Sequence, residues 1–422
     1  MDMVKLSPSQ LSGTVQAPPS KSYAHRAVIS AFLSGEKCKI GNLRLSADIS
    51  ATLDCIKQLG AEWTYDEKKK IAAIAPCNKE KSRPLLDCGE SGSTLRFFIP
   101  IAMAMNDEVS FTGHGRLMER PLEPYFEIFK KKKIKYKLKK GVLTVLGRLT
   151  AGTYEIDGTV SSQFITGLLF ALPLLEGDSE IKIIGTLTSR AYIDITLDVM
   201  NKFGIEIKNE NYSSFIIKGS QKYKAKSYTV EGDFSQAAFW LVAGALGCKI
   251  SCSGLDENSL QGDKKIIEII KKTGAVVKRI GKHTLSAQPT AKMHGIIVDA
   301  DPIPDLVPIL AVLLSFCKGK SRIENAGRLR IKESDRLAAI TAELRKMGAG
   351  ITEGEDFLEI QGKQILGGAE VSAWNDHRIA MALAVAACRC EGEVLIDGAK
   401  KAVTKSYPDF FEDYQSLGGV VE

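Results

Sequence analysis

The sequence predicts an α/β protein built from two similar domains, and three observations support this fold class. The chain has 422 residues, more than one hydrophobic core usually serves. A pattern of helix end, glycine and strand recurs along the whole chain. Four apolar runs indicate helices that are buried on every side. These runs cover residues 164–175, 237–247, 306–317 and 379–388.

The repeat has six markers, five glycines and one lysine in a degenerate copy. Glycine directly after a helix provides the left-handed cap that turns the chain into a strand. One such signal is weak, but six at an even spacing of 70 to 74 residues indicate an internal repeat. The markers are Gly60, Lys132, Gly204, Gly274, Gly348 and Gly418.

Six units divide into two halves of three, with the split expected near residues 228–230. Two such halves favour a ligand cleft between domains. The alternative is one continuous α/β sheet, and the chain has no GxGxxG or Walker loop that would support it.

The charge balance favours an anionic partner. The chain has 57 Lys and Arg against 50 Asp and Glu, a formal charge of +7. This excess does not choose between nucleic acid, a membrane surface and a phosphorylated metabolite. The densest basic run, 130–140, is predicted to be a solvated helix end and edge strand. An RNA-binding face is the alternative, and it would bind any polyanion in a salt-sensitive way.

Cysteine and histidine spacing gives no sign of a disulfide framework or a metal site. The nine cysteines form no CxxC pair, and the five histidines show no HExxH spacing. The N-terminus lacks the apolar region of a signal peptide. Every apolar run is shorter than the roughly 18 residues of a membrane span. We therefore expect a cytoplasmic protein without metal or cofactor.

Several segments place Ser, Lys, Arg or small residues directly before a predicted helix. Helix N-termini with exposed N–H groups suit phosphate or carboxylate, and the alternative is an ordinary N-cap. The segments are 18–26, 87–96, 161–163 and 189–192.

Charged segments precede the apolar helices as well, at 299–305, 328–336, 375–378 and 405–408. Solvated faces do not explain such clusters well, and the functional interpretation is favoured for 332–336. The loop 113–121 carries two arginines and is a candidate for closing on a ligand, or else a solvated connection.

In this order, the segments resemble the 5-enolpyruvylshikimate-3-phosphate synthase family from about residue 11 to 411. The most specific motifs are Ser20-Lys21-Ser22 with Arg26, the Lys-Glu-Ser-Asp-Arg block at 332–336, and the Asp-His-Arg-Ile-Ala-Met run at 376–381. The resemblance implies two domains of three βαβαββ repeats each, like inverse α/β barrels, with buried helices and a substrate cleft between them. It places the first domain at 19–228 and the second at 1–18 plus 229–422.

The resemblance also implies the reaction, in which the enolpyruvyl group of phosphoenolpyruvate moves to the 5-hydroxyl of shikimate 3-phosphate and phosphate is released. Asp305 resembles the base, Glu333 the acid, and Lys21 the residue between the two substrates. Two polyanions must meet, so cations have to offset their repulsion, and Arg suits planar carboxylates. No metal or cofactor is implied, the partners are these two substrates without nucleic acid or membrane, and a monomer is expected.

The binding residues implied by the resemblance fall into two sets. For shikimate 3-phosphate they are Lys21, Ser22, Arg26, Ser161, Ser162, Gln163, Ser189, Tyr192, Asp305, Arg328 and Lys332. For phosphoenolpyruvate they are Lys21, Gly92, Arg120, Gln163, Arg336, His377, Arg378 and Lys405.

The sequence departs from the family pattern at a few positions. Glu90 and Ser93 stand in place of Asn and Thr, Arg328 in place of Asn, and Ala191 in place of Pro. An anionic Glu90 beside a phosphate needs a nearby cation, for which Arg96 is the candidate.

Two rival interpretations remain: another enzyme of the same fold and a regulatory relative without catalytic activity. A UDP-N-acetylglucosamine enolpyruvyl transferase usually has a reactive cysteine in the mobile loop, and 113–121 has none. A catalytically silent relative is disfavoured by the presence of Asp305, Glu333 and Lys21.

Overall fold

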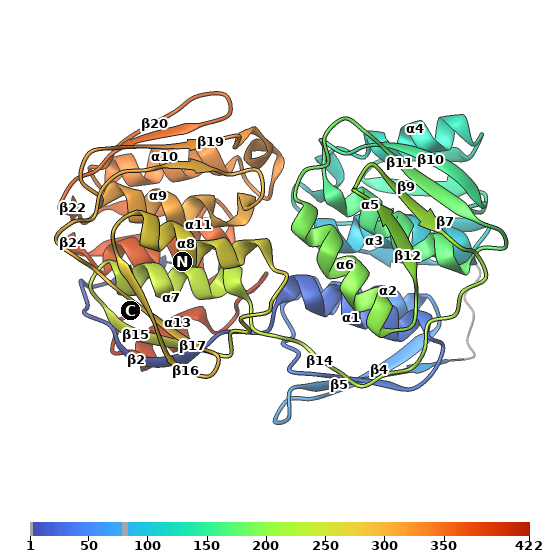
Figure 1. Ribbon diagram of the computed structural model, residues 1–422, viewed down its shortest axis with the longest axis horizontal. Coiled ribbons are helices and arrows are strands. Elements are labelled where there is room, and N and C mark those ends of the chain that lie inside the picture. Colours follow the sequence, from blue (N-terminus) through green and yellow to red (C-terminus); the bar gives the residue numbers. More distant parts are fainter. Residues whose placement is uncertain (1–2, 78–82) are drawn as a thin grey trace. The chain divides into compact units, whose positions relative to one another are not determined.

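The computed structural model describes residues 3–77 and 83–422, and the chain forms two compact units. Unit 1 comprises Met1–Pro18 and Glu231–Glu422, and unit 2 comprises Pro19–Val230. Both units are mixed α/β with small sheets, as Figure 1 shows.

Five four-stranded sheets in the described residues share one strand arrangement. A parallel pair starts each sheet, and two antiparallel neighbours follow. In unit 2 the first sheet has the strand order β14 (Tyr228–Thr229), β3 (Cys38–Gly41), β5 (Ile71–Pro76), β4 (Ala61–Asp66). The second has the order β6 (Leu85–Asp87), β7 (Glu108–Thr112), β9 (Val142–Leu146), β8 (Lys135–Lys139). The third has the order β10 (Gly152–Asp157), β11 (Ser179–Ile184), β13 (Ser214–Ile217), β12 (Ile207–Glu210). In unit 1 they are β2 (Ser12–Gln16), β15 (Lys249–Ser253), β17 (Thr284–Gln288), β16 (Val276–Gly281); and β18 (Ile297–Asp299), β19 (Lys320–Glu324), β21 (Leu358–Gln361), β20 (Gly350–Glu353).

A further sheet of unit 1 follows the same arrangement with the two ends of the chain. β23 (Glu370–Ser372) pairs in parallel with β25 (Val394–Asp397), and β25 pairs antiparallel with β1 (Met3–Leu6). An isolated antiparallel bridge from Leu6 to Val421 takes the place of a fourth strand. The strands β22 (Leu366–Gly367) and β24 (Cys390–Glu391) form a separate short parallel pair, and each directly precedes one strand of this sheet in the sequence.

The helices of each unit pack on one another. Unit 2 contains α1 (Lys21–Leu33), α2 (Ala47–Gln58), α3 (Gly92–Met105), α4 (Glu123–Lys131), α5 (Ser162–Ala171) and α6 (Arg190–Lys202), with 3-10 turns η1 (Leu117–Glu119) and η2 (Leu172–Leu174). Unit 1 contains α7 (Phe234–Ala245), α8 (Ile266–Lys272), α9 (Val307–Ser315), α10 (Arg336–Lys346), α11 (His377–Ala387), α12 (Ala399–Val403) and α13 (Phe410–Ser416), with η3 (Gly262–Lys265), η4 (Pro304–Leu306) and η5 (Gly327–Ile331).

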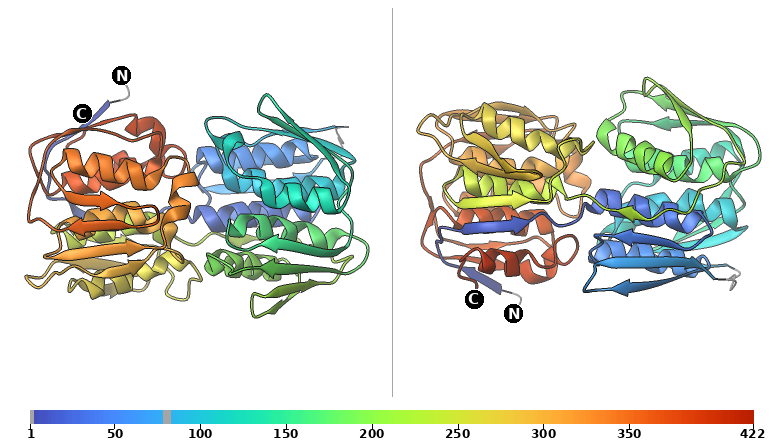
Figure 2. Two further views of the ribbon diagram at one scale, coloured as in Figure 1. Left: turned by 90° about the horizontal axis from the view of Figure 1, so that it is seen from above. Right: turned by 60° about the horizontal axis from the view of Figure 1, so that its bottom comes forward.

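The prediction of helices buried on every side is confirmed. All residues of α7, α9 and α11 are buried, which explains why these sequences lack a polar face. Helix α11 packs against α7, α9, α10 and α12, while in unit 2 α3 packs against α2 and α5. Figure 2 gives two further views of these helices and of the sheets within each unit.

The glycine markers are confirmed at five positions and wrong at the sixth. All five glycines follow a helix with φ between +84° and +96°, in the left-handed region. Lys132 itself has φ −88°, and the left-handed residue is its neighbour Lys133, with φ +56°. The degenerate repeat therefore turns one residue later, without glycine.

The basic run at 130–140 is a helix end and an edge strand, as predicted. Helix α4 ends at Lys131, and β8 lies at the edge of its sheet with most of its side chains exposed. Within the described part of the chain, none of the helices has the length and hydropathy needed to cross a membrane.

Candidate active site

The starts of α10 and α11, the turn η4 and the residues after α12 contribute to one group of charged side chains in unit 1. Arg336 opens α10 and is preceded by its N-cap Asp335, while His377 opens α11 after its N-cap Asp376. Asp caps form here because a carboxylate accepts the N–H bonds that a helix start leaves without partners. We call the group the acid–base cluster; its members are Asp305, Glu333, Arg336, Asp376, His377, Arg378 and Lys405.

Arg336 lies at the centre of the acid–base cluster. Its Nε is 2.8 Å from Asp376 Oδ2, its Nη1 is 3.0 Å from Asp305 Oδ1, and its Nη2 is 3.7 Å from Glu333 Oε1. Burial disfavours the charged guanidinium, but the three carboxylates outweigh burial and raise the pKa of Arg336 above its ordinary value. The same contact with Arg336 lowers the pKa of Asp376, although burial opposes this shift.

Asp305 is held between two guanidinium groups. Its Oδ1 accepts from Arg336, and its Oδ2 is 3.1 Å from Nη2 of Arg378. Arg378 also donates to the backbone oxygen of Asp305 at 3.0 Å and to Ser235 Oγ at 3.0 Å. Asp305, the predicted base, therefore accepts hydrogen bonds from the two guanidinium groups that the resemblance assigns to a substrate carboxylate.

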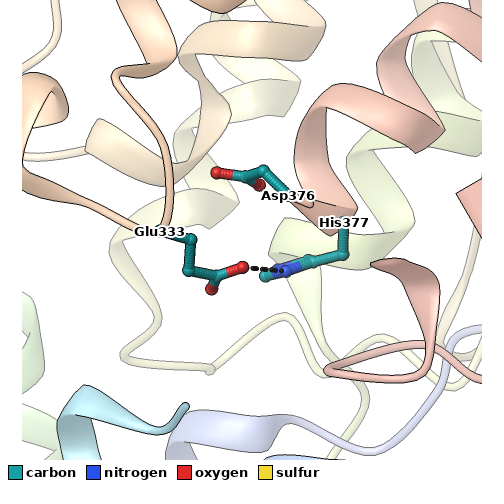
Figure 3. Close-up of side chains that lie close together, drawn as sticks. All are labelled: Glu333, Asp376 and His377. Carbon is teal, nitrogen blue, oxygen red and sulfur yellow. Dashed lines mark hydrogen bonds and ion pairs between the residues drawn. The ribbon is translucent and has the colours of Figure 1, made fainter. Parts of the chain in front are cut away.

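Glu333 faces His377 from the segment before α10, as Figure 3 shows. The Nδ1 atom of His377 lies 3.0 Å from Glu333 Oε2, and the histidine is 1% exposed. Lys405 Nζ is 3.9 Å from the same oxygen and donates to the backbone oxygen of Asn375 at 2.6 Å. The predicted acid thus has three basic side chains around it, since Arg336 is the third.

Three side chains of this cluster are also close enough together to be considered as ligands of a metal ion. One ligand atom each from Glu333, Asp376 and His377 lie within 4.8 Å of one another, and Figure 3 shows these side chains together. However, Asp376 already accepts from Arg336 and from Ser334 Oγ, at 2.8 Å and 3.1 Å. A divalent cation would have to displace a buried ion pair, so the geometry favours proton chemistry here.

The remaining predicted residues of unit 1 flank the cluster. Arg328 bonds Asp301 Oδ1 at 2.7 Å and the Asp301 backbone oxygen at 2.8 Å. Lys332 ends η5 and immediately precedes Glu333. Sequence reasoning left Asp376 out of the site residues, although the 376–381 motif contains it, because a helix cap and an Arg anchor have the same sequence signal.

In unit 2, four helix N-termini carry hydroxyl and cationic groups. These are the starts of α1, α3, α5 and α6, and hydrogen bonds link them in pairs. Gln163 of α5 donates to Ser93 Oγ of α3 at 2.9 Å, and Arg26 of α1 donates to the Tyr192 backbone oxygen of α6 at 3.0 Å. We call this group the hydroxyl–cation cluster; its members are Lys21, Ser22, Arg26, Gly92, Arg120, Ser161, Ser162, Gln163, Ser189 and Tyr192.

Arg26 and Lys21 are held differently. Arg26 is 3% exposed and donates to Thr196 Oγ1 at 2.8 Å and to the Ser22 backbone oxygen at 2.8 Å. Burial lowers the pKa of Arg26 to about 10. Lys21 instead bonds a carboxylate, since its Nζ lies 2.8 Å from Asp48 Oδ2.

Gly92 leaves room for the guanidinium of Arg120. A Cβ added to Gly92 would lie 2.5 Å from Nη1 and 2.8 Å from Cζ of Arg120. This is closer than real Cβ contacts come, so only glycine lets Arg120 take this position. The two residues predicted to hold one phosphate are therefore in direct contact.

The proposed pairing of Glu90 with Arg96 is not what the structure contains. Arg96 donates to Gln163 Oε1 at 2.6 Å and to the Pro121 backbone oxygen at 3.1 Å, and its guanidinium lies over the Phe164 ring. Burial, and secondly the charge of Arg120, lower the pKa of Arg96 to about 9. The side chain of Glu90 lies against Gly115.

The N-cap alternative holds for one serine and fails for another. Ser161 caps α5 by accepting from the Gln163 N–H at 3.3 Å. Ser189 stands at the same place before α6, but it has φ +54° and its side chain does not cap the helix. Left-handed backbone is uncommon for serine and persists only where surrounding contacts hold it. The loops before the two helices are joined, because the Thr188 N–H donates to the Gly158 backbone oxygen at 3.1 Å.

His25 connects three helices behind the hydroxyl–cation cluster, and no sequence signal pointed to it. Its Nδ1 is 2.7 Å from Thr52 Oγ1, Thr52 is 2.8 Å from Thr94 Oγ1, and Thr94 donates to Ser91 Oγ at 2.8 Å. Burial, with smaller contributions from Lys21 and Arg26, holds the pKa of His25 well below its ordinary value. The ring is therefore neutral and joins α1 to the N-cap of α3.

Comparison with known proteins gives the class to which this fold and these clusters belong. The model of the family EPSP synthase (3-phosphoshikimate 1-carboxyvinyltransferase) matches residues 6–414. The chain therefore belongs to the EPSP synthase family of enolpyruvyl transferases.

Particular relatives cover the chain from end to end. It is 49% identical over 432 residues to the 3-phosphoshikimate 1-carboxyvinyltransferase of Clostridium novyi (strain NT), covering 100% of this chain and 99% of the relative. It is 50% identical over 426 residues to the protein of that name from Clostridium acetobutylicum, covering 100% and 98%. The EPSP synthase structure from Acinetobacter baumannii superposes with a TM-score of 0.81 at 23% identity, over 100% of this chain and 99% of that one. This match shows the fold alone.

Proposed function

We propose that this protein transfers the enolpyruvyl group of phosphoenolpyruvate to the 5-hydroxyl of shikimate 3-phosphate and releases phosphate. The protein is a 3-phosphoshikimate 1-carboxyvinyltransferase of the shikimate pathway, which leads to chorismate and the aromatic amino acids. The observation that carries the residue assignments is the pair of contacts in the acid–base cluster. One carboxylate lies between two guanidinium groups, and a second carboxylate lies against a buried histidine.

The carboxylate of phosphoenolpyruvate binds Arg336, Arg378 and Lys405 in this proposal. Two of these cations already bond a carboxylate, that of Asp305, at 3.0 Å and 3.1 Å. A substrate carboxylate competes for the same N–H groups and weakens the hold on Asp305. Asp305 then becomes a stronger base when the donor is in place, which is when the 5-hydroxyl has to lose its proton.

Addition needs an acid at the same time as a base. The 5-hydroxyl oxygen bonds C2 of the donor, its proton passes to Asp305, and Glu333 gives a proton to C3. Glu333 must therefore be protonated, whereas Arg336, Lys405 and a protonated His377 all favour its ionised form. The negative charges of two bound substrates offset these cations and favour the protonated form of Glu333.

Elimination reverses both proton transfers. Glu333 takes a proton from C3, the bond from C2 to the phosphate oxygen breaks, and Asp305 returns a proton to the leaving phosphate. The same two residues serve in both halves because each ends the addition in the state that the elimination requires.

The hydroxyl–cation cluster binds the substrates rather than moving protons. Ser161, Ser162 and Ser189, with Lys332, hold the phosphate of shikimate 3-phosphate, and Ser22, Arg26 and Tyr192 contact its ring and carboxylate. Gly92, Arg120 and Gln163 bind the phosphate of the donor. Support comes from the helix starts, whose N–H groups and dipoles favour anions. Lys21 lies between the two substrates, and Arg328 acts near the shikimate ring.

We also propose the finer description of the fold and of the protein's state. Each unit is built of three βαβαββ copies, which is supported by the common strand arrangement of the sheets. We propose a location in the cytoplasm, where the nine free cysteines would stay reduced, and we propose a monomer. Light scattering on a sizing column tests the monomer, and a dimer mass would reject it.

Phosphorus NMR of the purified protein with both substrates tests the reaction. Inorganic phosphate and a shifted product signal should appear only when phosphoenolpyruvate and shikimate 3-phosphate are both present. If they do not, the same experiment with UDP-N-acetylglucosamine tests the alternative acceptor. Silence with both acceptors would reject an enolpyruvyl transferase activity.

A further inference from the structure

The turn that leads into α11 has an unusual backbone. Trp374 and Asn375 are consecutive, neither is glycine, and both are left-handed, with φ +52° and +51°. They join β23 to the N-cap of α11, Asp376. L-residues avoid this conformation, and it persists only where surrounding contacts hold it.

A buried carboxylate makes the contacts that hold this turn. Glu343 of α10 is 2% exposed, and its Oε1 accepts from the indole Nε1 of Trp374 at 2.7 Å. Its Oε2 accepts from the Ser372 N–H at 3.0 Å and from Lys346 Nζ at 2.7 Å. The two oxygens of Glu343 thus bind the first residue of the strained pair and the strand end that precedes it.

The turn in turn places two parts of the acid–base cluster. The backbone oxygen of Asn375 accepts from Lys405 Nζ at 2.6 Å. The next residue, Asp376, bonds Arg336 at 2.8 Å through Nε. Arg336 opens the helix that also carries Glu343, so one helix provides both a cluster cation and the anchor of the turn.

We propose that Trp374 and Glu343 are positioning residues for the carboxylate of the donor substrate. Through the turn they fix the position of Lys405 and the orientation of Asp376, and hence the arrangement of the cations that bind this carboxylate. This inference rests on the proposed function. It concerns binding of one substrate, because neither residue touches the groups assigned to the shikimate 3-phosphate.

The variant Trp374→Phe removes the indole N–H and keeps an aromatic ring. The KM for phosphoenolpyruvate should rise by up to about tenfold, because donor binding then has to order the loosened turn, at a cost no larger than that of one lost hydrogen bond to a charged group. The kcat should change less than this KM, because Trp374 and Glu343 contact neither Asp305 nor Glu333 directly, and the KM for shikimate 3-phosphate should change least. Trp374 is 40% exposed, so the smaller ring leaves no buried cavity.

Trp63→Phe in β4 is the matched control. Its indole Nε1 is buried without a hydrogen-bond partner among the described residues, so the same substitution removes no bond. A second variant, Glu343→Gln, changes the other side of the contact. Combined with Trp374→Phe it should add less than its own single effect, because the neutral amide weakens the same contact that the phenyl ring removes.

The outcomes are distinguishable from those for the reaction itself. If the wild-type protein and Trp63→Phe release no phosphate, the proposed function fails. If they do, and Trp374→Phe leaves the KM for phosphoenolpyruvate unchanged or raises both KM values equally, the positioning role is wrong. A selective rise with a less than additive double variant supports it.

Discussion

Helix N-termini contribute to both clusters, but the N-cap residues of these helices differ between the two units. In unit 1 the caps of α7, α10 and α11 are Asp233, Asp335 and Asp376. In unit 2 the caps of α1, α3 and α5 are the serines Ser20, Ser91 and Ser161. Both residue types satisfy the first N–H groups of a helix, but only aspartate brings a negative charge to it.

This difference separates the chemistry of the two units. In unit 1 the carboxylates recruit arginines, and the pKa of Arg336 is raised by them. In unit 2 the buried guanidinium groups of Arg26 and Arg96 bond hydroxyl, amide and carbonyl groups, and burial lowers their pKa values to about 10 and about 9. A buried arginine whose charge is balanced only by neutral hydrogen-bond acceptors is stabilised most when an anion binds. This contrast agrees with the proposed division of roles, in which unit 1 moves protons and unit 2 binds phosphate.

The largest effect should come from removing Glu333, the proposed acid of unit 1. Glu333→Gln keeps the shape of the side chain but cannot give a proton, so kcat should fall by about 10² to 10⁴. KM for either substrate should change less than about threefold. Steady-state phosphate release measures both, with exposed Glu355→Gln as the control. Unchanged turnover would show that Glu333 takes no part in the mechanism. The proposed difference in role between the two clusters would then be wrong.

Gly92→Ala tests the unit 2 side of the comparison. The new methyl would meet Arg120 at 2.5 Å and push its guanidinium away, so KM for phosphoenolpyruvate should rise about tenfold or more. The kcat should fall less, because no proton-transfer group moves. Gly281→Ala is the control, since a Cβ there meets nothing within 4 Å. Equal kinetics for the two variants would show that Arg120 does not bind the donor.

The variant Asp305→Asn tests whether Asp305, the proposed base, competes with the substrate carboxylate for Arg336 and Arg378. The neutral amide releases Arg336 and Arg378, so phosphoenolpyruvate should bind about three- to tenfold more tightly while turnover is lost. Titration calorimetry with phosphoenolpyruvate measures the affinity directly. Weaker binding in this variant would contradict the competition, although the role of Asp305 as a base could still stand.

The smallest effect concerns pH and His25. Its pKa is lowered in the folded state, so the stability that it contributes is complete above the unfolded pKa of about 6.5 and is lost as pH falls. The loss should reach about 1.4 kcal/mol by pH 5.5. His25→Gln keeps a partner for Thr52 and cannot titrate, so unfolding between pH 7.5 and 5.5 should depend less on pH. Exposed His294→Gln should retain the wild-type slope.

Local signals in the sequence determined a large part of this protein. The buried helices follow from runs without a polar face, and five left-handed glycines follow from their place after a helix. The serine caps of α1 and α5 were also readable, because capping involves residues within one turn. The motifs around Lys21, Glu333 and Arg378 indicated the family.

Only the tertiary structure decided which charged groups meet. Asp305 and Arg378 are 73 residues apart, and Arg336 and Asp376 are 40 apart, so no local pattern could pair them. The same reason explains an error, since Arg96 binds Gln163, 67 residues away, rather than Glu90. Helices and caps depend on neighbours along the chain, whereas ion pairs depend on which helix ends the fold brings together.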